Sequence, residues 1–142
     1  MGLDVSHDCW SGAYSAFSRW RNEMARVAGY HVRPVSYDDH GSYETVLIDW
    51  GHLPDGCLDG AWPETPADPL MVLIAHQDCE GSIFRDQQIP LAERLEELAP
   101  LVIEPEGWNG HVGRNGGFAA CALQFAKGLR DAYAADETVE FH

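Results

Sequence analysis

Basic residues are scarce in this sequence. Lysine and arginine together number 9 against 23 aspartates and glutamates, so the formal net charge is −14 at pH 7. All of the acidic excess lies between residues 36 and 110, where Arg85 and Arg94 are the only lysine or arginine residues. A surface with this charge repels a phosphate backbone, so we expect no nucleic-acid partner. Two interpretations stay open: an ordinary solvated acidic surface, and a surface that docks on a basic partner or mimics nucleic acid.

Long apolar runs, an export signal and cysteine pairs are also missing. No stretch approaches the roughly 18 apolar residues of a membrane span, and the N-terminal segment MGLDVSHDCW lacks the basic start and apolar middle of a signal peptide. The absence of a C-x-x-C pair argues against a disulfide framework and against a zinc knuckle. We therefore expect no membrane partner, a cytoplasmic location, and free thiols at Cys9, Cys57, Cys79 and Cys121.

The motifs that most often identify an enzyme are absent as well. The sequence contains no G-x-S-x-G elbow, no P-loop, no G-x-G-x-x-G and no H-E-x-x-H. The glycine-rich stretch 109–118 leads into an expected helix, whose N-terminus can receive an anion, but it lacks the lysine and hydroxyl of a phosphate-binding loop. Asn109, His111 and Arg114 are candidate binding residues in this stretch.

The elements that are present predict one α+β domain over residues 1–142. We expect a small sheet of about three strands packed by three or four helices. Alternating or β-branched residues indicate strands at 2–6, 45–49 and 138–142. Apolar residues at helical spacing indicate helices from Trp10 to Val27, over 69–76 after an Asp68 cap, over 89–98 with Pro90 in the first turn, and over 117–134. The run at 69–76 is also consistent with a strand.

Two other segments bear on function. The stretch 50–69 is crowded with glycine, proline and aspartate, so Trp50 and Trp62 either anchor a long loop or line the mouth of a pocket. The strand 138–142 can pair with residues 2–6 or with residues 45–49. If it joins the sheet in the right direction, His142 would lie near His7.

The stretch LIAHQDCEGSIF, residues 73–84, is similar to part of an EF-hand calcium loop between two helices. When Gly81 takes the sixth position of that loop, the first, third and fifth positions fall on His76, Asp78 and Glu80. Calcium prefers oxygen ligands, so a histidine at the first position and the amide of Gln87 at the twelfth predict weak calcium binding at most. Imidazole moves the preference toward zinc, nickel or copper.

A second cluster near the N-terminus repeats the same residue types. His7, Asp8 and Cys9 echo the histidine, aspartate and cysteine of the central loop. If the two segments meet in space, the metal ligands would be His7, His76, Asp78 and Glu80. The candidate catalytic residues would be His7, Asp8, Cys9, His76 and Asp78.

Structural roles for the same residues are equally consistent with the sequence. His7 and Asp8 would then cap the first helix, and both thiols would be small buried hydrophobes. His76 would close a turn in which Asp78 makes an Asx turn and Gly81 has a positive φ.

Three stretches together carry a family resemblance. MGLDVSHDCWSGAYSAFSRWR at the start, HQDCEGSI with LAERLEEL in the middle, and FAKGLRDAYAADETVEFH at the end resemble an uncharacterised family of small bacteriophage and prophage proteins. The central motif of that family reads H-S-D-C-D-G-E, whereas this chain has Gln77, Glu80 and Ser82 at the differing positions. The resemblance implies a phage accessory protein in the host cytoplasm and supplies no known reaction.

Two classes of function follow. In the first, the chain is a non-enzymatic acidic module that binds a host or phage protein, or a small molecule, to counter a host defence. In the second, it is a metal-dependent hydrolase in which the histidines and aspartates hold a metal that lowers the pKa of a bound water.

Overall fold

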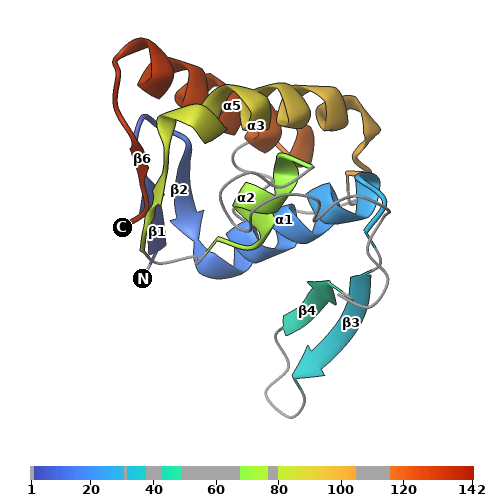
Figure 1. The fold of residues 1–142 in the computed structure, drawn as a ribbon. Coiled ribbons are helices and arrows are strands. Elements are labelled where there is room, and N and C mark those ends of the chain that lie inside the picture. The colour runs from blue at the N-terminus through green and yellow to red at the C-terminus, as the bar shows by residue number, and fades with distance from the viewer. Residues whose placement is uncertain (1, 31, 38–42, 49–67, 77–79, 105–115) are drawn as a thin grey trace.

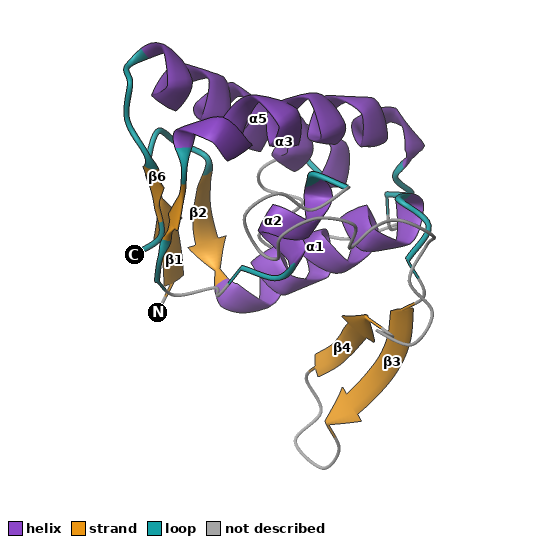
Figure 2. Cartoon of the chain, viewed as in Figure 1, coloured by secondary structure: helices purple, strands orange, loops and turns teal. Residues whose placement is uncertain are grey.

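The structure is a computed structural model that describes residues 2–30, 32–37, 43–48, 68–76, 80–104 and 116–142 (Figure 1). Its helices are α1 (Tyr14–Val27), α2 (Leu70–Ile74), α3 (Arg85–Leu98), the 3-10 turn η2 (Ala99–Leu101) and α5 (Phe118–Ala134). Figure 2 shows that the helices make up the body, that short strands lie at one end of it, and that a separate hairpin projects from it. This arrangement confirms the predicted α+β class. Within the described residues, no helix is long and apolar enough to cross a membrane.

The C-terminal segment lies between the N-terminal strand and a short strand from the middle of the chain. Strand β1 (Gly2–Val5) pairs antiparallel with β2 (Trp10–Ala13), and β5 (Ser82–Ile83) pairs antiparallel with β6 (Val139–Glu140). A bridge between Val5 and Phe141 joins the two pairs. The tail therefore does pair with residues 2–6, as one of the two expectations had it. The antiparallel direction places His142 opposite Asp4, with which it exchanges two backbone hydrogen bonds of 2.8 and 3.3 Å, rather than beside His7.

The predicted strand at 45–49 exists but has a different partner. It corresponds to β4 (Tyr43–Ile48), which pairs antiparallel with β3 (Val32–Tyr37) in the projecting hairpin. Pairing with a neighbour a few residues away has a low loop-closure cost, which favours this local partner over the distant terminal strands. Strand β3 was not among the predicted strands. It contains Pro34, and proline is tolerated in strands only at edges or bulges.

Two helix boundaries differ from the prediction. Residues 10–13 form strand β2, so α1 begins at Tyr14 even though Trp10 belongs to the same apolar stripe. Pairing with β1 decides this, because it holds Trp10 opposite Val5. Helix α3 begins at Arg85 rather than 89, because the Gln87 side chain accepts a 3.0 Å hydrogen bond from the Phe84 N–H and caps the helix there. Pro90 therefore lies inside the helix rather than in its first turn.

The core is aromatic where α1 meets α5. Trp20 is fully buried and stacks on Trp10 at 5.5 Å and on Phe125 at 5.3 Å between ring centroids. Helices α3 and α5 pack side by side (Figure 1). The predicted apolar faces of these two helices are confirmed as buried, at Leu91, Leu95 and Leu98 and at Phe118, Cys121, Ala122, Phe125, Leu129 and Ala132.

Asp68 connects the short helix α2 to the rest of the body. Its Oδ1 accepts the Leu70 N–H at 3.0 Å, so the carboxylate caps the helix as predicted. Its Oδ2 accepts the Tyr30 hydroxyl at 2.7 Å, and Arg94 of α3 pairs with Oδ1 at 3.1 Å. One carboxylate thereby holds α2, α3 and the segment after α1 together.

Candidate functional site

The turn between β1 and β2 contains the first predicted cluster. The Cys9 N–H donates to the Ser6 carbonyl at 3.2 Å, and the two residues between them have positive φ, 60° at His7 and 57° at Asp8. Two successive positive φ values are typical of a type I′ hairpin turn. The expectation that His7 and Asp8 cap the first helix is therefore wrong, because these residues reverse the chain before β2 begins.

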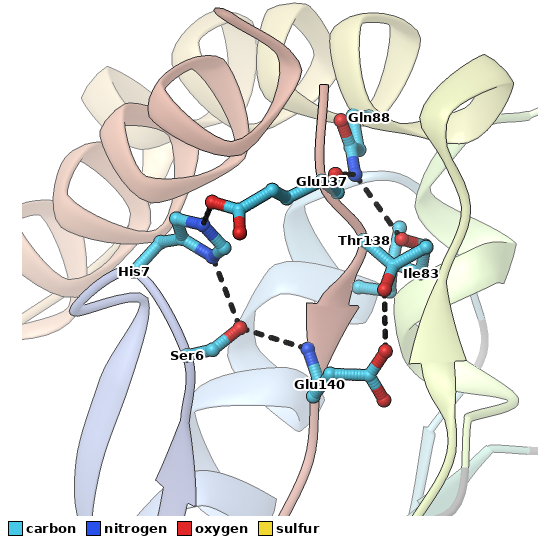
Figure 3. Close-up of polar contacts among 7 residues, drawn as sticks. All are labelled: Ser6, His7, Ile83, Gln88, Glu137, Thr138 and Glu140. Carbon is cyan, nitrogen blue, oxygen red and sulfur yellow. Dashed lines mark hydrogen bonds and ion pairs between the residues drawn. The ribbon is translucent and has the colours of Figure 1, made fainter. Parts of the chain in front are cut away.

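His7 lies in a relay of hydrogen bonds that reaches the C-terminal segment (Figure 3). The Glu140 N–H donates to Ser6 Oγ at 2.9 Å, and Ser6 Oγ lies 3.0 Å from His7 Nδ1. His7 Nε2 lies 3.1 Å from a carboxylate oxygen of Glu137. A carboxylate accepts, so the Nε2–H group donates a hydrogen bond to Glu137. In the neutral imidazole, Nδ1 then accepts a hydrogen bond from the Ser6 hydroxyl. Both ring nitrogens thus have partners, and the bond to Glu137 ties the β1–β2 turn to the segment that leads into β6.

This relay has the residue types of a Ser–His–acid triad without its free nucleophile. In a triad the serine oxygen faces the substrate and its proton goes to the histidine. Here Ser6 Oγ instead accepts the Glu140 N–H, and so continues the pairing of β1 with β6 through a side chain. The arrangement favours a structural clamp over acyl transfer. Sequence reasoning missed Ser6 and Glu137, because no local pattern links two residues on opposite ends of the chain.

Further polar contacts extend the clamp toward β5. The Glu140 carboxylate accepts the Ser82 hydroxyl at 2.6 Å and the Thr138 hydroxyl. The Ser82 bond, followed by the Thr138 bond, lowers the pKa of Glu140 from its usual value. Gln88 is fully buried. Its side-chain amide N–H donates to the Glu137 carbonyl at 2.7 Å and to the Ile83 carbonyl at 3.2 Å.

His76 has its own set of partners. Its ring stacks on Phe141 with 4.0 Å between centroids, and its Nε2 donates to the Ser82 carbonyl at 3.2 Å. Gly81 has φ 103°, and a Cβ there would come within 3.0 Å of the imidazole. Arg21 donates to the His76 carbonyl at 2.7 Å. This is the predicted turn-closing histidine, with the glycine at positive φ as expected.

The expected helix–loop–helix is present around this histidine. Helix α2 precedes the loop, α3 follows it, and Ile83 of β5 lies between them. In an EF-hand pair, the strand at the corresponding position joins a second loop; here β5 joins β6 instead. Asp78 and Cys79 lie outside the described residues, so the ligand positions of this loop are only partly placed.

The described parts of the two clusters do not assemble into a metal site. His7 contacts Ser6 and Glu137, whereas His76 contacts Ser82 and Phe141. Across the described ranges, no three His, Cys, Asp or Glu side chains are placed to hold a metal ion. Binding of zinc or of weak calcium at this loop stays a prediction.

Cys9 is placed as a buried hydrophobe rather than as a nucleophile. Its side chain is 1% exposed, and its Sγ lies 3.7 Å from the Phe125 carbonyl. Burial, with the nearby charges of Asp131 and Asp8, raises the pKa of the Cys9 thiol to about 12. The turn approaches α5 closely at Gly128, where a Cβ would come within 2.8 Å of the His7 carbonyl oxygen.

We expect Cys9 to resist alkylation in the folded protein. A thiol with a pKa of about 12 has roughly a thousandfold less thiolate at pH 7 than a thiol with the ordinary pKa of 9.0, and the thiolate is the reactive form. Iodoacetamide labelling followed by peptide mass spectrometry would measure this, with the same protein in urea as the control. Native labelling of Cys9 as fast as in urea would contradict the burial and restore it as a candidate nucleophile.

The N-terminus of α5 already holds an anion that belongs to the chain. The Glu104 carboxylate accepts the N–H groups of Phe118 at 2.8 Å and Ala119 at 2.9 Å. The preceding Gly117 has φ 99°, and a Cβ at that position would overlap the carboxylate. The N–H groups at this helix end, which could otherwise receive an external anion, thus have an acceptor within the chain. The candidate binding residues Asn109, His111 and Arg114, together with Trp50 and Trp62, lie outside the described residues.

Comparison with known proteins adds no relative: no protein-family model, curated protein or solved structure gives a significant match to the chain. The resemblance to phage proteins therefore stays a prediction.

Proposed function

We propose that this chain is a non-enzymatic acidic binding module that docks on a basic surface of a host or phage protein. Charge complementarity of this kind accelerates encounter and selects against wrong partners. The proposal draws on the acidic excess between residues 36 and 110, part of which lies in the described helices.

The observation that carries the proposal is that many basic side chains pair with carboxylates of the same chain. Five of them lie 2.5–3.1 Å from carboxylates of the same chain: Arg26, Arg85, Arg94, Lys127 and Arg130. By contrast, Glu80, Asp86 and Glu93 are exposed and have no hydrogen-bond or ion-pair partner among the described residues. The remaining acidic charge is therefore available to an external cation.

The chemistry of two cysteines and two histidines, among them the candidate catalytic residues His7, Cys9 and His76, supports the same conclusion. Burial raises the pKa of both Cys9 and Cys121 to about 12, which disfavours thiolate chemistry near neutral pH. Both His7 and His76 make hydrogen bonds that hold strands and turns in place. These four side chains are accounted for by the fold.

Affinity capture from a bacterial lysate with the tagged full chain would test the proposal. We expect a partner recovered in stoichiometric amount at about 50 mM salt and lost at about 500 mM, because salt screens interactions between exposed charges. Recovery of no such partner would count against the binding module. Stoichiometric zinc in untagged protein purified without chelator would instead favour the hydrolase.

A matched pair of charge reversals then locates the contact. Glu93→Lys changes an exposed acid of α3 within the acidic middle, and Asp4→Lys makes the same change outside it. We expect Glu93→Lys to weaken the captured complex by about fivefold or more, mainly through the association rate, and Asp4→Lys to change it little. Equal effects of both variants would show that only the net charge matters.

A further inference from the structure

An open hollow lies between the C-terminal end of α2 and the N-terminal end of α3. It has a volume of ≈ 450 Å³ and is lined by His76, Glu80, Gly81, Ser82 and Phe84. The Phe84 ring is 57% exposed, although it adjoins the buried strand β5. The hollow therefore presents an aromatic ring and a carboxylate to solvent in one place.

The wall of this hollow is held rigidly. His76 is fixed by its stack on Phe141 and by its bond to the Ser82 carbonyl. Ser82 is fixed by its strand pairing with Glu140 and by its 2.6 Å side-chain bond to the same residue. The Phe84 backbone is held by the Gln87 cap. A preformed wall lowers the entropy cost of binding.

An exposed aromatic ring beside an exposed carboxylate matches a guanidinium group. Arginine stacks its planar cation on aromatic faces and presents a fork of N–H donors to carboxylates, whereas the lysine ammonium is a strongly hydrated point charge. The chain makes this pairing internally next to the hollow. Arg85 lies 4.5 Å from the centre of the Tyr133 ring and 2.7 Å from the Asp136 carboxylate, and it does not line the hollow.

We propose that the hollow receives an arginine side chain of the partner, stacked on Phe84 and paired with Glu80. The inference rests on the proposed acidic binding function and names its contact point. Two observations select a cationic occupant: Glu80 has no partner among the described residues, and no described lysine or arginine lines the hollow. A single exposed aromatic residue does not by itself indicate a binding site, but Phe84 lies beside a rigid wall and beside the unpaired carboxylate of Glu80.

The test uses three blocked hexapeptides that carry three arginines, three lysines or three citrullines. Each is titrated into ¹⁵N-labelled full chain while the backbone amide shifts are followed. We expect the arginine peptide to shift Gly81, Ser82 and Phe84 saturably and more tightly than the lysine peptide does. Citrulline keeps the shape of arginine without its charge, so its peptide should leave these amides unchanged.

Two variants identify the contacts. Phe84→Leu should lower the affinity for the arginine peptide about two- to fivefold, which is the contribution of an exposed cation–π contact. Glu80→Gln should also weaken it, while Glu93→Gln, which removes the same charge outside the hollow, should leave the shifts at Gly81–Phe84 in place. The amide shifts of α5 serve as the check that each variant remains folded.

The outcomes separate this inference from the broader function. Shifts spread over many acidic surfaces and unaffected by Phe84→Leu would overturn the hollow as the contact, while an acidic binding module would still stand. Equal affinity for the arginine and lysine peptides would overturn the stacking on Phe84. Absence of any shift would also overturn the proposal that the hollow binds arginine. Partner capture alone would then test whether the chain is an acidic binding module.

Discussion

Replacement of Trp20 by alanine is expected to lower the free energy of unfolding by about 3–5 kcal/mol. Trp20 is fully buried, and its ring stacks on Trp10 of β2 and on Phe125 of α5. Truncation removes the side chain that joins α1 to both elements and leaves a cavity in a rigid core. Urea denaturation followed by far-UV circular dichroism would measure the change.

Leu123→Ala is the matched control for this loss of apolar volume. Leu123 is 52% exposed on α5, so its truncation should change the free energy of unfolding by no more than about 0.5 kcal/mol. A cost below about 1 kcal/mol for Trp20→Ala would mean that the aromatic stack does not hold α1 against α5.

Asp68→Ala is expected to cost about 3 kcal/mol of folding stability. The substitution removes the cap of α2, the acceptor of the Tyr30 hydroxyl, and the partner of Arg94 in a pair whose side chains are only 14% and 21% exposed. Removal of Asp68 leaves the largely buried Arg94 with the exposed Glu97, 2.8 Å away, as its remaining carboxylate partner, so much of the compensation of its charge is lost. Because α2 leads into His76, the same variant should also disturb the amide shifts around the hollow.

Asp131→Ala provides the control, since it breaks an exposed pair with Lys127 at 2.9 Å on α5. Such an exposed pair contributes little to folding stability, because water and salt screen it. Chemical denaturation of the two variants and the unsubstituted chain would compare them directly. If both variants cost the same small amount, Asp68 would be an ordinary surface cap rather than a link between helices.

The sequence predicted the features that depend on neighbours along the chain. Apolar residues three and four positions apart identified the buried faces of α3 and α5, because side chains at this spacing lie on one side of a helix. The Asp68 cap and the positive φ of Gly81 also follow from local preferences. Trp10 shows the limit of such patterns, since it fits the helical stripe of α1 but lies in strand β2.

The sequence identified residues of the candidate site but did not predict which residues they contact. His76 closes its loop, as its structural interpretation had it, whereas His7 lies in a hairpin turn instead of capping α1. Their expected convergence rested on matching residue types in two segments, and type alone does not place segments in space. Their partners, Glu137 and Phe141, lie far away in sequence and flank β6, so the pairing of that strand in the fold brings them near.

The sequence by itself determined the α+β class, the helical faces and the concentration of acidic charge, because these depend on composition and on spacing within one element. The tertiary structure decided which strands pair, which carboxylate caps α5, and where an aromatic ring and a free acid share one hollow. Glu104 reaches the start of α5 across an intervening segment, and Glu137 reaches His7 from the opposite end of the chain. Such contacts depend on the packing of whole elements against one another, and no pattern along the chain encodes them.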